Sequence, residues 1–254
     1  MQRLTGVRIP HSPLFIDVTF KGLYVMSKNK NGNDNGFSNK RKPKGPIKFQ
    51  VQLNDEQKIA KQKIISNAIT VLNGKAGSGK TLLACQEALD MLFRKDVKKI
   101  IITRPTVSKE EIGFLPGDLR EKMEPWMQPI YSNFYQLYKR EKIEKILSDG
   151  SVEIVPVAFM RGRTFLDSFV IVDEAQNCTH EQTEMIASRL GIRSKMVICG
   201  DNQQVDLKQK HDSGFKFILS ASKRVKDMDS HTLITNHRNS VVDDLLEEYM
   251  KLHN

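Results

Sequence analysis

The sequence has few cysteines, a single tryptophan and no long hydrophobic run. Its three cysteines, Cys85, Cys178 and Cys199, are far apart in 254 residues and show no CxxC spacing. Scattered cysteines favour reduced thiols in the cytosol over a disulfide framework or a zinc site. No apolar run reaches the roughly 18 residues of a membrane span, and Pro10 and Asp17 interrupt any signal-peptide core. We therefore expect a cytoplasmic protein without a membrane segment.

The charge is distributed unevenly along the chain. The first 50 residues hold 10 of the 40 Lys and Arg residues but only 2 of the 30 Asp and Glu residues. The remainder is close to neutral, so the overall net charge of +10 does not identify the folded part as a nucleic-acid binder. Residues 27–48 are rich in Asn, Gly, Lys and Pro and poor in apolar residues, which is typical of a disordered linker. We predict a disordered basic arm at 1–48 and one domain at 49–254.

The first 25 residues suggest a further hypothesis. Met26 opens the stretch MSKNKNGN, which is a plausible native start. The peptide Val7–Pro10 can be encoded by a sequence of the kind found in the TΨC arm of a tRNA gene. We infer a start codon assigned too early, so that residues 1–25 are not native. A peptide from upstream of Met26, found in protein from the native host, would refute this.

Short apolar runs alternate with helical patterns from residue 51 onward. The predicted strands are AITVLNG, KKIIITR, VEIVPV, SFVIVDEA, KMVICG and HTLIT. The predicted helices cover 55–68, 79–95, much of 118–147, 180–190, 214–222 and 240–252. This alternation predicts an α/β fold, with a mainly parallel sheet flanked by helices.

A glycine-rich stretch between the first strand and the second helix matches the phosphate-loop pattern G-x-x-x-x-G-K-[ST] at every position. Backbone N–H groups of such a loop, together with the helix N-terminus, bind phosphates. Lys80 is expected to reach the β- and γ-phosphates, and the Thr81 hydroxyl to bind Mg²⁺. The alternative is a flexible turn with a chance Lys-Thr. The residues predicted to bind ATP here are Gly74, Lys75, Ala76, Gly77, Ser78, Gly79, Lys80 and Thr81.

Two carboxylates follow the apolar strand Phe169–Val172. At the carboxyl end of a parallel strand they point into the crevice where α/β proteins bind ligands. Asp173 is expected to hold the metal, and Glu174 to orient and polarise the attacking water. The alternative is a solvated strand end without a catalytic role.

Two glutamines are candidates for nucleotide contacts. Gln204 lies three residues after Asp201, at the end of a third apolar strand, where a neutral side chain can sense the γ-phosphate. Gln57 precedes the first strand, where its amide can read the adenine edge. The alternatives are a surface turn for Gln204 and an exposed helix position for Gln57.

These motifs together resemble the PhoH-like family of P-loop ATPases, which are relatives of superfamily-one helicases. The resemblance covers residues 50–250 and consists of LNDEQ, NGKAGSGKT, the block from TRP to GFLPG and beyond, MRGRTF, VIVDEAQN, GDNQQVDL and HRN, in that order. It implies a RecA-like fold, binding of ATP and Mg²⁺, and a role on RNA. The positions that match the family's nucleotide motifs are Gly77, Gly79, Lys80, Thr81, Asp173, Glu174 and Gln204.

Four arginines acquire candidate roles from the resemblance. Arg238 precedes the final helix, where an arginine in related motors stabilises the transition state from its own or a neighbouring subunit. Arg104 lies where helicase relatives touch the nucleic-acid backbone, and Arg161 and Arg163 are further candidates for phosphate contact or a subunit interface. For each of them the alternative is a structural or surface role.

A single RecA-like domain offers only one side of a motor's nucleotide site. We therefore expect a homo-oligomeric ring, and the family suggests a hexamer. Three functions remain open: a motor or remodeller on single-stranded RNA or DNA, an ATPase switch acting on protein partners, and a nucleotide-binding module with negligible turnover. The Asp173–Glu174 pair disfavours the last. A compact, Asn- and Lys-rich ATPase also suits a bacteriophage gene.

Overall fold

The structure, a computed structural model, describes residues 47–105 and 119–237, and single positions of the C-terminal segment at 241, 244, 245, 248, 249 and 251. They lie within one compact unit, Pro43–Asn254. The predicted arm falls almost entirely outside the described residues, so its boundary and the hypothesis on residues 1–25 stay predictions. The described positions from 241 onward are helical, as expected there.

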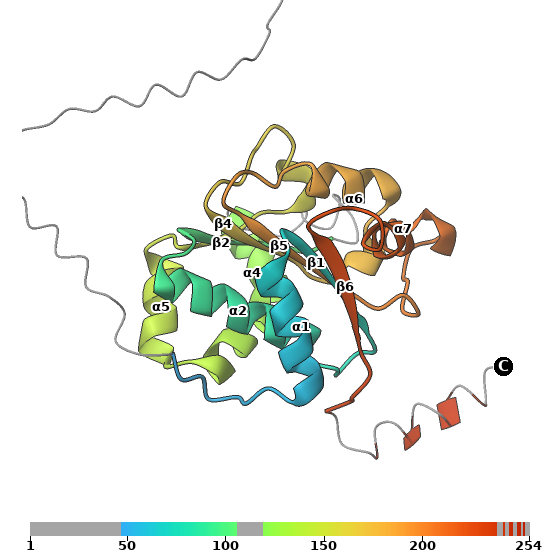
Figure 1. Ribbon diagram of the computed structural model, residues 1–254, viewed down its shortest axis with the longest axis horizontal. Helices are drawn as coiled ribbons and strands as arrows, with labels where there is room; N and C mark the ends of the chain where they lie inside the picture. Colours follow the sequence, from blue (N-terminus) through green and yellow to red (C-terminus); the bar gives the residue numbers. More distant parts are fainter. Residues whose placement is uncertain are drawn as a thin grey trace, which may run out of the picture. The chain divides into compact units, whose positions relative to one another are not determined.

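A six-stranded sheet forms the centre of the described unit (Figure 1). Its strands pair in the order β3 (Val152–Ile154), β2 (Lys99–Thr103), β4 (Ser168–Val172), β5 (Lys195–Gly200), β1 (Ile69–Gly74) and β6 (Met228–Leu233). Every one of these pairings is parallel. The predicted RecA-like α/β fold is confirmed. The strand β5 separates β1, which leads into the phosphate loop, from β4, which leads into the two carboxylates.

Helices cover both faces of the sheet (Figure 1). One face carries α1 (Asp55–Ser66), α2 (Lys80–Arg94), α4 (Leu119–Leu137) and α5 (Arg140–Ser148). The other carries α6 (His180–Ala187) and α7 (Phe215–Ala221), with the short 3-10 turns η1 (Val157–Phe159) and η2 (Ala175–Asn177). A third 3-10 turn, η3, spans Lys210–Asp212. None of the described helices is long and apolar enough to cross a membrane.

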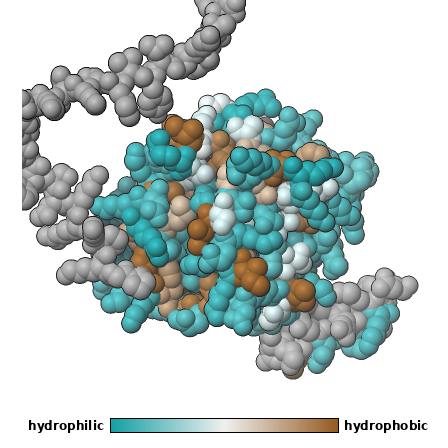
Figure 2. All heavy atoms as spheres, viewed as in Figure 1, coloured by the Kyte–Doolittle hydropathy of each residue, from teal (hydrophilic) through white to brown (hydrophobic). Residues whose placement is uncertain are grey.

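Consecutive strand residues enter two different cores, because side chains alternate across a sheet. Ile171 packs into the core under α1, α2, α4 and α5, whereas Val170 packs into the core under α6 and α7. Both faces are buried, which explains why the central strands β2, β4 and β5 read as nearly continuous apolar runs. Hydrophobic residues on the face seen in Figure 2 form scattered spots in a mainly hydrophilic surface. The three cysteines are buried free thiols.

Several predicted boundaries differ from the structure, and two of the differences have a clear physical reason. The helical stretch at 118–147 consists of two helices, because the Lys139 backbone leaves the helical region (φ −58°, ψ 129°) and the Leu137 carbonyl accepts a hydrogen bond from Gln50 N (3.1 Å). Strand β6 starts at Met228, before the predicted HTLIT. It is an edge strand held to β1 by its backbone, so its polar residues Asp229 and Ser230 need no apolar partner.

Candidate nucleotide-binding site

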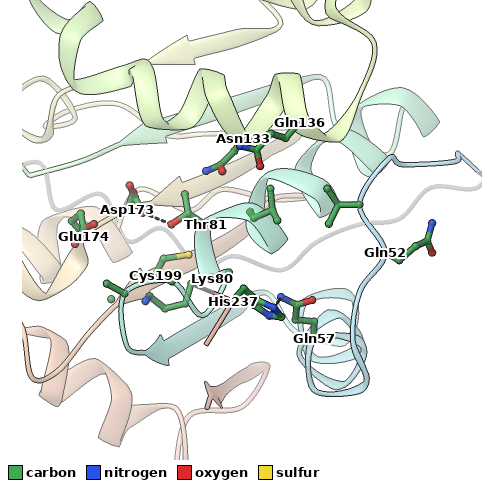
Figure 3. A pocket seen from close by; sticks show the side chains of 16 residues that line it. Gln52, Gln57, Lys80, Thr81, Asn133, Gln136, Asp173, Glu174, Cys199 and His237 are labelled. Atoms are coloured by element: carbon green, nitrogen blue, oxygen red, sulfur yellow. Dashed lines mark hydrogen bonds between the residues drawn. The ribbon is translucent and has the colours of Figure 1, made fainter. Parts of the chain in front are cut away.

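The carboxyl ends of β1, β4 and β5 meet at one edge of the sheet, where parallel α/β folds bind ligands. A cavity of about 480 Å³, the first pocket, opens there (Figure 3). Its lining comes from the phosphate loop, α1, α4, the ends of β4 and β5, and the segment after β6. The lining residues are Val51, Gln52, Gln57, Ala76, Gly77, Gly79, Lys80, Thr81, Leu82, Asn133, Gln136, Asp173, Glu174, Cys199, Gly200 and His237.

The phosphate loop joins β1 to α2 in a conformation that requires glycine. Gly77 and Gly79 have φ values of 88° and 81°, and a Cβ on Gly79 would lie 2.6 Å from Gln57 Nε2. Lys80 opens α2, and its ammonium donates to the carbonyls of Gly74 (2.7 Å) and Lys75 (3.0 Å). The lysine therefore lies folded over the loop, next to the unpaired N–H groups of the first helical turn. This arrangement is a preformed anion site.

The predicted loop residues divide into two groups. Ala76, Gly77, Gly79, Lys80 and Thr81 line the first pocket. The others shape the loop: Gly74 and Lys75 accept from Lys80, and Ser78 N donates to Lys75 O (3.2 Å).

The hydroxyl of Thr81 and the carboxylate of Asp173 meet at the base of the first pocket (Figure 3). Thr81 Oγ1 donates to Asp173 Oδ1 at 2.7 Å, and Asp173 N donates to Thr103 O at 2.9 Å. Asp173 is buried, and this burial raises the pKa of its carboxyl group, only partly opposed by the bond from Thr81. Glu174 raises it further and Arg104 lowers it. A cation would offset the cost of this buried charge.

The residues present fit a magnesium ion. Thr81 and Asp173 supply hard oxygen ligands from two elements, and Mg²⁺ in nucleotide sites takes one or two protein ligands together with water and phosphate. The hydroxyl of Ser78 in the same loop is buried without a hydrogen-bond partner. Within 47–105, 119–237 and the described C-terminal positions, no three His, Cys, Asp or Glu side chains form a self-sufficient metal site.

Glu174 stands between the first pocket and a second pocket of about 630 Å³. Its backbone is in the left-handed region, with φ 51°. Its carboxylate accepts a hydrogen bond from Gln176 Nε2 (2.7 Å) and lies 3.7 Å from Arg104 Nη2. The second pocket is lined by Arg104, Pro105, Glu174, Gln176, Asn177, Gln203, Gln204, Val205, Asp206 and Lys210.

The two predicted glutamines line different pockets. Gln204 lines the second pocket, because the chain turns after β5 with Gln204 N donating to Asp201 O (3.2 Å). Gln57 lines the first pocket and is buried. Its Oε1 accepts from Asn54 N (3.2 Å) in the capping box of α1, and its Nε2 lies 3.4 Å from the Nε2 of His237. The alternative of an exposed helix position for Gln57 is wrong.

The three candidate arginines that the structure describes, Arg104, Arg161 and Arg163, do not line one pocket. Arg104 lines the second pocket. Arg163 donates to Glu153 (2.7 Å) and lies over the Phe165 ring, so the structure supports the structural alternative for it. Neither Arg163 nor the exposed Arg161 lines either pocket. Arg238 lies outside the described residues, so its role stays a prediction.

Several lining residues were missed in the sequence. His237 N donates to Gly77 O (3.1 Å), which ties the segment after β6 to the phosphate loop. Asn133 and Gln136 project from α4 toward the first pocket (Figure 3). Their spacing of three places both amides on one face of the helix and was an available signal. Gln176 belongs to the quoted VDEAQN motif, but its bond to Glu174 could not be foreseen.

Comparisons with known proteins agree with these motifs. The family model described as PhoH-like protein matches residues 51–251. A PhoH-like protein of Mycobacterium bovis is 40% identical over 193 residues, covering 74% of this chain and 54% of the relative. One from Bacillus subtilis is 43% identical over 170 residues, covering 66% and 52%. The chain thus spans about half the length of these curated relatives. Both come from bacteria, so the comparisons do not support the predicted phage origin.

A likeness to solved structures is more distant. The Pif1 helicase of Candida albicans aligns with a TM-score of 0.42 and 17% identity, covering 78% of this chain and 44% of the helicase.

Proposed function

The chain belongs to the PhoH-like family, and we propose that it binds ATP with Mg²⁺ and hydrolyses the terminal phosphate bond. The observation that carries the proposal is the 2.7 Å contact between Thr81 Oγ1 and Asp173 Oδ1 at the base of the first pocket. It joins the start of α2 to the end of β4, so that a phosphate-binding helix N-terminus and a buried carboxylate serve one cavity.

Each side chain has a separate task in this proposal. When ATP binds, the Lys80 ammonium leaves the two loop carbonyls and donates to the β- and γ-phosphate oxygens. The negative charge on these oxygens grows toward the transition state. Thr81 and Asp173 would hold Mg²⁺, which neutralises phosphate charge when bound. Glu174, at the rim of the same pocket, orients and polarises the attacking water.

The test is the ATPase rate of Lys80→Ala. Loss of an ammonium aimed at the developing charge lowers kcat by about 100-fold or more. Lys58→Ala is the matched control, because Lys58 is an exposed α1 lysine paired with Asp55 outside the first pocket. Near-normal turnover of a folded Lys80→Ala protein would remove the assignment.

The finer proposal is that hydrolysis drives remodelling of, or movement along, single-stranded RNA or DNA. The second pocket supports it, since two cationic side chains, Arg104 and Lys210, line the pocket that Glu174 also lines. The alternative is a switch acting on protein partners. Hydrolysis accelerated by a single-stranded polymer favours the first, and an unchanged rate favours the second.

The proposal extends to a homo-oligomer, with the hexameric ring as the expected form, in the cytoplasm. Arg238 of one copy would complete the γ-phosphate site of the next. Mixing Arg238→Ala with Lys80→Ala protein should then restore part of the activity. No recovery in verified hetero-oligomers would place Arg238 in its own chain's site or outside catalysis.

A further inference from the structure

Two described polar partners of the Glu174 carboxylate, Arg104 and Gln176, belong to the second pocket. Arg104 Nη2 lies 3.7 Å from Glu174 Oε1, and Gln176 Nε2 donates to Oε2 at 2.7 Å. Glu174 lines the first pocket as well. A ligand in the second pocket can therefore change where the proposed catalytic carboxylate points.

Gln176 connects Glu174 to the far wall of the second pocket. Its Oε1 accepts from Asp201 N at 3.1 Å, and a backbone N–H can only donate, so the amide group must face Glu174 with its NH₂. Asp201 opens the segment 201–206, which supplies Gln203, Gln204 and Asp206 to the pocket. A ligand that contacts segment 201–206 can therefore affect Glu174 through the buried side chain of Gln176.

The contact between Arg104 and Glu174 is loose. At 3.7 Å it exceeds an ordinary N–H···O distance, and the two side chains are 26% and 42% exposed. Half-solvated ion pairs of this kind are weak. A guanidinium binds a phosphate through two shorter, parallel hydrogen bonds, so a phosphate can displace the carboxylate from Arg104.

The chemistry of the second pocket fits a nucleic-acid strand. Arg104 and Lys210 offer positive charge for a phosphodiester, and the Gln203 and Gln204 amides can bond to sugar or base. The carboxylate of Asp206 already accepts from Asn177 Nδ2 at 3.0 Å. Glu174 is thus the carboxylate that a phosphate at Arg104 would replace.

We propose that a phosphodiester of a single-stranded nucleic acid binds Arg104 in the second pocket and thereby releases Glu174 toward the nucleotide pocket. The inference rests on the proposed function and deepens it, since it makes polymer stimulation an exchange of partners at one arginine. Because Glu174 and the phosphodiester compete for Arg104, removing the Glu174 charge strengthens binding of the polymer.

The first experiment compares Arg104→Ala with Arg163→Ala, whose arginine also pairs with a glutamate but lines neither pocket. ATPase rates are measured with and without oligo(dT) and oligo(rU) of about 20 nucleotides, which is longer than the roughly 4–16 nucleotides that a single-strand-binding OB fold covers. Arg104→Ala should raise the kcat measured without polymer about two- to fivefold, which is the change expected when Glu174 loses a weak ion pair. The polymer should then no longer accelerate hydrolysis. Arg163→Ala should retain the parent's rates. A polymer-free rate at or below the parent's overturns the proposal.

The second experiment requires no hydrolysis, so it separates this proposal from the ATPase assignment. Binding of the labelled oligonucleotides, without ATP, is followed by fluorescence anisotropy. Glu174→Gln should bind the polymer about two- to fivefold more tightly than the parent, and the gain should disappear in Arg104→Ala/Glu174→Gln. Unchanged or weaker binding by Glu174→Gln overturns the exchange. Equal gains with inorganic polyphosphate would overturn the nucleic-acid assignment, whereas a gain with either oligonucleotide alone identifies the polymer.

Discussion

The two ends of strand β4 carry aspartates in opposite situations. Asp167, just before the strand, accepts from Arg193 Nη2 (3.0 Å) and Lys98 Nζ (3.1 Å), and these partners hold its pKa at about 2. Asp173, just after the strand, is buried with Thr81 and a neighbouring carboxylate, and its pKa is raised. The surroundings of Asp167 thus stabilise its negative charge, whereas the burial of Asp173 makes its negative charge unfavourable.

The carboxyl end of the sheet also holds buried polar atoms without partners. Among the described residues these include Ser78 Oγ, Thr103 Oγ1 and Asp201 Oδ2, which all lie in or next to the segments that form the two pockets. Such atoms destabilise a fold and concentrate at functional sites, where ligands satisfy them. The comparison teaches that the site edge is organised for a charged ligand, while the opposite edge contributes stability.

The largest expected effect is on kcat, which should depend on the carboxylate after β4 and not on the one before it. Glu174→Gln should lower kcat by about 100-fold or more while ATP affinity is retained, because an amide keeps the shape but cannot polarise water. Asp167→Asn should leave kcat unchanged. Steady-state ATPase assays with a separate nucleotide-binding measurement check this. Full kcat in Glu174→Gln would require another catalytic carboxylate.

A smaller effect separates the aspartates by stability. Asp173→Asn removes a buried charge and should stabilise the nucleotide-free protein, by about 0.5–2 kcal/mol, the usual gain when a functional-site cost is relieved. Asp167→Asn should instead lower the Tm, because Arg193 and Lys98 lose their partner. Thermal unfolding at neutral pH without ATP measures both. A lower Tm for Asp173→Asn would show that its bond from Thr81 outweighs the cost of burial.

The pH dependence of these two variants gives the finest distinction. The pKa of Asp167 is lowered from 3.8 to about 2, so its contribution is fully present above 3.8 and is lost as the pH falls toward 2. The deficit of Asp167→Asn should shrink in that window. The pKa of Asp173 is raised, so its carboxyl group does not destabilise the fold in acid, where it is protonated in both states. The stability gained by Asp173→Asn should therefore grow as the pH rises above 3.8. Denaturant midpoints against pH test this, and parallel trends for the two variants would contradict it.

Local sequence was sufficient wherever one continuous segment makes the structure. The phosphate loop could be predicted because its glycines, lysine and threonine act within eight residues between a strand and a helix. Asp173 and Glu174 could be placed because four apolar residues before them form a buried strand, and parallel strands expose their carboxyl ends at one edge. The alternation of strands and helices determined the fold class for the same reason.

Only the tertiary structure decided which distant side chains meet. Gln57 and His237 are 180 residues apart, and they touch because β6 pairs with β1 beside α1. The pairing of Arg163 with Glu153, the approach of Arg104 to Glu174 and the position of Gln204 in the second pocket depend likewise on which strand ends are neighbours. Strand order is chosen by burying both faces of the whole sheet at once. No local pattern encodes the strand order. The motifs could therefore be identified from the sequence alone, whereas the side chains that contact them were determined by the tertiary structure.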